Sequence, residues 1–108
     1  MAETFKVLGQ IQGGAGAQVT LYTVPAATSA VVGVCYICNQ GAATTIRARV
    51  NIAGAGDAGT QFILYDTAIG ANQTTEILRG LCLAATDVVK VQSASGNVSF
   101  TLYGDEIS

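Results

Sequence analysis

Residues 30–39 read Ala-Val-Val-Gly-Val-Cys-Tyr-Ile-Cys-Asn and contain no charged side chain. Successive side chains of an extended chain point to opposite faces. A short, uncharged run rich in β-branched residues predicts a strand buried on both sides, either inside a β-sandwich or between copies of the protein. Apolar residues would occupy both faces, with Val32, Val34, Tyr36 and Cys38 on one and Val31, Cys35 and Ile37 on the other.

Shorter strands are expected on either side of this run, because turn-forming residues recur roughly every 8–12 residues. We therefore predict an all-β fold, an antiparallel β-sandwich or jelly roll of about eight short strands. A single domain would span residues 1–108, without a full helix. Residues 12–17, 54–59 and 94–97 would form turns, and Asp87 would accept hydrogen bonds from local amides. The other strands are expected at residues 5–11, 18–24, 45–52, 61–69, 74–83, 88–93 and 98–103.

The composition is poor in charge. Charged residues make up 11% of the chain and apolar residues 50%, whereas about 25% charged is usual. Little repulsion between copies favours self-association; the alternative is a neutral surface that tolerates exposure. The net charge of −2 argues against nucleic acid as a partner, because such binding depends on clustered Lys and Arg. The basic residues are scattered: Lys6, Arg47, Arg49, Arg79 and Lys90.

Targeting signals and redox sites are not expected. The N-terminal segment lacks the pattern of a signal peptide, and no run approaches the ~20 apolar residues of a membrane span. Synthesis in a cytoplasm is therefore expected, with no membrane partner. The three cysteines are expected as reduced, buried thiols. Cys35 and Cys38 would face opposite sides of a strand, so they could neither form a disulfide nor share a metal ion.

Catalytic patterns are also missing from the sequence. Neither glycine-rich run, 13–16 or 54–59, is followed by the Lys-Ser/Thr of a phosphate-binding loop. The carboxylates are dispersed and histidine is absent, which leaves no converging acid–base group. We therefore expect a non-enzymatic protein without a cofactor or metal ion.

One polar pair stands out. Arg47 and Arg49 share a face of the strand expected at residues 45–52. This face is either solvated or a contact between subunits, with each guanidinium pairing a carboxylate such as Glu76 or Asp66 of a neighbour.

Four segments together resemble the short β-sandwich virion proteins of tailed bacteriophages, including phages of cyanobacteria. The resemblance runs from residue 18 to residue 104 and concerns strand and turn patterns. The segments are Thr-Leu-Tyr-Thr-Val-Pro at 20–25, Ile-Cys-Asn at 37–39, Leu-Cys-Leu-Ala-Ala-Thr-Asp-Val-Val-Lys-Val at 81–91 and Ser-Phe-Thr-Leu-Tyr-Gly at 99–104.

This resemblance implies a virion structural protein made in the host cytoplasm. The favoured placement is a capsid decoration or cement protein, a homotrimer that clamps neighbouring copies of the phage major capsid protein. A small tail, neck or baseplate component, or a host-surface-binding module, is the alternative. The expected interface residues lie in the segment 5–11, on the arginine face and in the loop 54–59: Phe5, Lys6, Val7, Arg47, Arg49 and Asp57.

Overall fold

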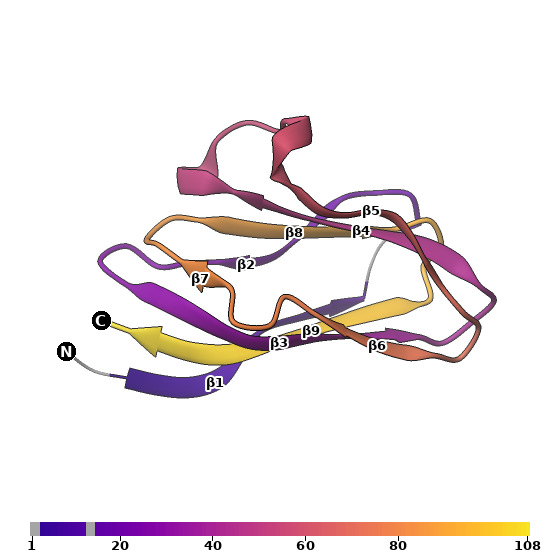
Figure 1. Cartoon of the computed structure of the whole chain (residues 1–108), viewed down its shortest axis with the longest axis horizontal. Coiled ribbons are helices and arrows are strands. Elements are labelled where there is room, and N and C mark those ends of the chain that lie inside the picture. Colours follow the sequence, from indigo (N-terminus) through magenta and orange to yellow (C-terminus); the bar gives the residue numbers. More distant parts are fainter. Residues whose placement is uncertain (1–2, 13–14) are drawn as a thin grey trace.

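The computed structural model describes residues 3–12 and 15–108, which form two antiparallel β-sheets packed face to face (Figure 1). The first, hereafter the β1 sheet, has the order β1 (Glu3–Gln12), β9 (Val98–Ile107), β3 (Ser29–Asn39), β6 (Thr74–Ile77), and β7 (Cys82–Leu83) also pairs with β3. The second, hereafter the β2 sheet, has the order β2 (Val19–Thr23), β8 (Val88–Ser93), β4 (Thr44–Asn51), β5 (Phe62–Ile69). The predicted all-β sandwich is confirmed.

The strand pairing identifies the sandwich as a jelly roll. β1 pairs with β9, β2 with β8, β3 with β6 and β7, and β4 with β5, all antiparallel. These nested pairs describe one long hairpin rolled up on itself, and the β3–β9 and β4–β8 ladders close the roll. This is the double-sheet jelly-roll arrangement.

The core lies between the two sheets. Inward side chains of both sheets fill it, and the largest of them are 0–1% exposed. Fully burying such a side chain stabilises the fold by about 1.5–3 kcal/mol. The β1 sheet contributes Ile37, Phe100 and Leu102, and the β2 sheet contributes Ile46, Val89 and Val91.

β3 differs from the sequence prediction in how its side chains alternate. Its register against β9 shifts between Val32 and Val34, around Gly33, so the inward face changes phase there. The predicted placement of Val32 and Tyr36 on one face is therefore wrong, since Val32 is buried and Tyr36 is 40% exposed. The chain covers the other side of β3 only in part, since Val34 is 3% exposed whereas Val31 and Tyr36 are 39% and 40% exposed. Burial of that side by copies stays a prediction. The inward residues are Ala30, Val32, Cys35 and Ile37.

Residues 74–83 form two short strands instead of the single one predicted. Leu78 and Gly80 have φ of 62° and 69°, and residues in this region cannot continue a strand. Cys82 alternates with buried Leu83 on β7 and is exposed, so the expectation of three buried thiols is wrong for Cys82. Cys35 lies in the core, where burial raises its pKa to about 12.

The connections also differ in part from the predictions. Residues 94–97 form the predicted turn, and this turn links β8 to β9 in the opposite sheet. The loop after β4 contains two 3₁₀ turns, η1 (Ile52–Gly54) and η2 (Gly59–Gln61). The predicted role of Asp87 is confirmed, because its carboxylate accepts hydrogen bonds from the amides of Ala53 and Ala84. The turn predicted at 12–17 includes Gly13 and Gly14, which lie outside the described residues.

Candidate assembly surface

The outer face of the β1 sheet carries an apolar groove, and no described element lies over it (Figure 1). Phe5 and Val7 of β1 are 78% and 55% exposed. In the ladder, Phe5 and Val31 both lie opposite Asp105, and Val7 lies opposite Tyr103. Directly opposed residues share a face. The groove that they line has a volume of about 580 Å³.

Two glycines form the floor of this groove. The Tyr103 ring lies across Gly33, where an added Cβ would stand 2.9 Å from the ring. A Cβ on Gly104 would stand 2.1 Å from the carbonyl oxygen of Val31. Tyr103 is held further by stacking on Tyr36, with ring centroids 5.8 Å apart. Gly33 and Gly104 lie at the register shift between β3 and β9 and have no side chains. The space above them therefore stays open between the apolar side chains of the groove.

The first half of β1 is an exposed edge. Residues 3–7 are all exposed, although their side chains alternate between the two faces. β1 is also the terminal strand of its sheet, so its outer edge presents unpaired backbone groups. An edge strand with apolar, exposed side chains is typical of a contact with another chain.

An ionic contact anchors this exposed end to the opposite sheet. Lys6 Nζ lies 2.9 Å from Glu106 Oε1, and the Tyr22 hydroxyl of β2 donates a hydrogen bond to Glu106 Oε2. The Tyr22 hydrogen bond and Lys6 lower the pKa of Glu106, whereas burial and Glu106 raise that of Tyr22. Glu106 therefore connects β1 and β9, which carry the groove, to β2 of the opposite sheet.

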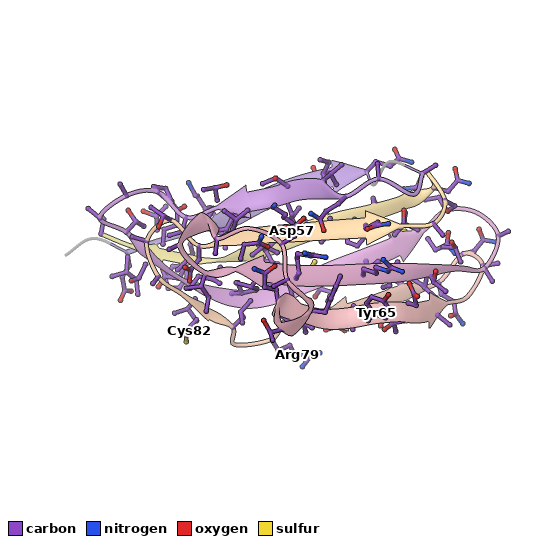
Figure 2. The ribbon with its side chains drawn as sticks, turned by 90° about the horizontal axis from the view of Figure 1, so that it is seen from above. Asp57, Tyr65, Arg79 and Cys82 are labelled. Atoms are coloured by element: carbon purple, nitrogen blue, oxygen red, sulfur yellow. The ribbon has the colours of Figure 1, made fainter. Side chains whose placement is uncertain are left out.

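The outer face of the β2 sheet is polar and internally paired (Figure 2). Arg47 donates two hydrogen bonds to Asp66 of its own chain, at 2.6 and 3.1 Å, and its guanidinium lies 4.2 Å from the centre of the Tyr65 ring. Arg49 lies 4.1 Å from the centre of the Phe62 ring. The carboxylate that was expected from a neighbouring copy is thus supplied to Arg47 within the chain. An interface role for this face stays a prediction.

Asp57 joins the loop after β4 to this polar face. It accepts hydrogen bonds from Asn51, Lys90 and Gln18 at 2.8, 3.1 and 3.0 Å, and Arg49 lies 3.3 Å away. These contacts, led by the Asn51 hydrogen bond, lower the pKa of Asp57. The loop consequently folds back over the outer face of the β2 sheet, where Asp57 lies in Figure 2.

The predicted interface residues therefore fall into two groups on opposite faces. Phe5, Lys6 and Val7 line the groove together. The other group, Arg47, Arg49 and Asp57, belongs to the polar face. Sequence reasoning missed Val31, Tyr103 and Asp105 as groove residues. The signal that could have revealed them is the apolar alternation of 99–105, which requires knowing that this strand lies between β1 and β3.

Metal and membrane sites were also considered. Within residues 3–12 and 15–108, no cluster of three or more His, Cys, Asp or Glu side chains could hold a metal ion. The described part of the chain contains no helix long and apolar enough to cross a membrane.

Comparisons with known proteins support the fold. No known protein family matches this sequence, and neither does any curated protein. A chain in the solved structure of infectious bursal disease virus, Gx strain, is similar, with a TM-score of 0.57 and 12% sequence identity. The match covers 97% of this chain but only 30% of the viral chain. At this identity the similarity concerns the fold alone.

Proposed function

We propose that this protein is a non-enzymatic virion structural protein, a decoration or cement protein of a tailed-phage capsid. It would self-associate, as a trimer, and clamp neighbouring subunits of the major capsid protein. The observation that carries the proposal is the open apolar groove on the β1 sheet of a chain that has few charges.

The size of this face suits a stable contact. Four strands at a spacing of ~4.8 Å and a ten-residue β9 at ~3.4 Å per residue give roughly 19 by 34 Å. The resulting area of about 650 Å² approaches the ~800 Å² that each partner buries in a standard interface. Burying Phe5 and Val7 there would recover apolar surface that folding leaves in water.

Reinforcement follows from mass action. A protein that binds only the assembled shell lowers the free energy of that shell and slows the loss of subunits. Several weak contacts made by one oligomer add through avidity. The jelly roll supports this class because viral capsid domains use it, although lectins and cupins share the architecture. The similar chain in a virus structure points the same way.

The test is cryo-electron microscopy of phage particles purified from cells in which this chain is produced. We expect its density at three-fold positions over the capsid shell. Density confined to the tail, neck or baseplate would contradict the cement role and support the alternative placement. Absence from the particle would contradict any virion role.

A variant pair ties the particle result to the groove. We expect Phe5→Thr with Val7→Thr to reduce incorporation into particles, because the apolar walls of the groove are lost. Ile63→Thr removes an apolar side chain of 45% exposure from β5 of the other sheet and is the matched control. Equal incorporation of both variants would contradict a role for the groove.

A further inference from the structure

The cations of this chain are all engaged within it. Each of the five Lys and Arg side chains lies within 3.3 Å of a carboxylate oxygen of the same chain. The pairs are Lys6–Glu106, Arg47–Asp66, Arg49–Asp57, Arg79–Glu76 and Lys90–Asp57.

The remaining carboxylates are distributed unevenly. Three acidic residues have no Lys or Arg partner among residues 3–12 and 15–108: Glu3, Asp87 and Asp105. Asp87 is satisfied by backbone amides of its turn. Asp105 lines the groove, and Glu3 lies just beyond it, two residues before Phe5 on the same face of β1. The uncompensated negative charge of the chain is thus concentrated beside its apolar groove.

One carboxylate oxygen of Asp105 accepts no hydrogen bond from the described residues. This atom, Oδ1, is buried, and Asp105 lies among Phe5, Val31 and Tyr103. A buried polar atom without a partner is costly, and a carboxylate oxygen more so. Asp105 lines the groove, so a cationic group bound there would compensate the charge of its carboxylate.

We propose that the groove binds a segment of a different protein that combines apolar side chains with an Arg or Lys, whose cationic group pairs with Asp105. The apolar side chains contact Phe5, Val7 and Tyr103. Glu3 adds a second negative charge at the rim. This inference rests on the proposed function only in identifying the partner as a capsid subunit.

A second copy of this chain fits the groove poorly. It has no uncommitted Lys or Arg, so it could pair with Asp105 only by breaking one of its own ion pairs. Two copies stacked groove to groove would also bring the Glu3 and Asp105 carboxylates of both to one interface, where like charges repel. Self-association is therefore expected through another surface.

The experiment is a selection from a displayed library of random dodecapeptides, with the purified 108-residue protein as the target. We expect enriched peptides to contain Arg or Lys beside apolar residues. Their affinity should fall at least about tenfold for Asp105→Asn and for Phe5→Thr, and a smaller loss is expected for Glu3→Gln. Binding should also weaken as the salt concentration rises.

Two matched controls separate the groove from general effects. Glu76→Gln makes the same change in net charge on the far edge of the sheet, and Ile63→Thr removes an apolar side chain from the other sheet. Both should retain peptide binding. Thermal unfolding of each variant confirms that it is folded, and the exposed Glu3 gives a readout even if Asp105→Asn destabilises the chain.

Three results would overturn the inference: no binders, binders without enrichment in Arg or Lys, or an affinity for Asp105→Asn within twofold of the wild type. Sedimentation showing a dimer that Phe5→Thr abolishes and Ile63→Thr preserves would assign the groove to a second copy instead. The selection uses purified protein, so its outcome is independent of where the chain lies in a particle. Failure of the proposed function and failure of this inference are therefore distinguishable.

Discussion

The two outer faces of the jelly roll differ in how many of their polar and apolar side chains have partners within the chain. The β2 sheet is covered in part by its own loop, and its cations are paired with carboxylates and stacked on Phe62 and Tyr65. The β1 sheet leaves Phe5, Val7 and one oxygen of Asp105 without partners among the described residues. The cations of the first face are paired within the chain, although Arg49 Nε and Asn51 Oδ1 there also lack a hydrogen-bond partner in the described part of the chain. The second face differs in presenting an apolar groove with an acidic residue in its lining.

This difference depends on where the few charged residues of the chain lie. Three of the five cations, Arg47, Arg49 and Lys90, pair on the outer face of the β2 sheet. The other two, Lys6 and Arg79, pair at the two edge strands of the β1 sheet or just beyond them. Lys6 lines the groove but is paired with Glu106, so no Lys or Arg side chain among the described residues that line it is uncommitted. A surface can therefore be poor in charge overall and still carry a defined electrostatic preference.

The largest loss of stability is expected at Gly104, where the floor of the groove lies against the backbone of β3. Gly104→Ala would place a Cβ 2.1 Å from the carbonyl oxygen of Val31, so β3 and β9 must move apart. Overpacking of this kind costs about 1–3 kcal/mol, and a backbone obstacle favours the upper end. Urea unfolding measures the loss. Gly56→Ala is the control, because nothing lies within 4 Å of its added Cβ; equal stability of the two variants would contradict the tight approach.

On the polar face, the effect should depend on what replaces Arg49. This residue is 9% exposed, stacks on Phe62 and pairs with Asp57. Arg49→Ala loses both contacts and is expected to cost about 2 kcal/mol, as for hydrogen bonds to charged groups. Arg49→Met keeps an apolar stem on the ring and should cost less than Arg49→Ala, because the contact with Phe62 is partly retained and Asp57 still pairs with Lys90 in both variants. Equal losses would show that stacking contributes nothing.

The contrast between the faces was only partly predictable from the sequence. The strands at 88–93 and 45–52 were found because alternation is a local signal. The jelly-roll order depends on pairing between distant segments, such as β1 with β9, which no local pattern encodes. Continuation of β9 through Ile107 was missed for the same reason, because its acidic end is stabilised by ladders to β1 and β3.

The groove shows the same division. Phe5 and Val7 were predicted as interface residues because the segment around them could reach across to an adjacent subunit. The phase change at Gly33 was not predictable, since a register shift is a property of two strands together. It decides that Val31 and Tyr36 face outward and that the groove has a floor without side chains. The role proposed for Asp105 depends on Phe5 and Val31, which the strand pairing places opposite it.

A pH titration tests the carboxylates of the polar face with a smaller effect, and Glu106 of β9, whose pKa is also lowered, contributes to the same decrease. The pKa values of Asp57 and Asp66 are lowered in the folded state by their hydrogen-bonding partners on the polar face. A folded pKa below the unfolded value stabilises the fold above the unfolded pKa, and this contribution is lost as pH falls through the folded pKa. Urea midpoints should therefore fall as pH decreases from about 6 to about 3. Asp57→Asn should show a smaller decrease, and an unchanged decrease would contradict the role of Asp57.

The smallest effect on stability is expected at the groove walls. Phe5→Thr with Val7→Thr keeps strand-forming residues at positions that are 78% and 55% exposed, so the unfolding free energy should change by no more than about 0.5 kcal/mol. Retention on a hydrophobic-interaction column should fall, more than for Ile63→Thr. A loss above about 1 kcal/mol would mean that these side chains already pack within the chain. If the two substitutions leave the unfolding free energy unchanged, Phe5 and Val7 do not stabilise the isolated chain. Their apolar surface would then contribute favourably only when a bound partner removes it from water.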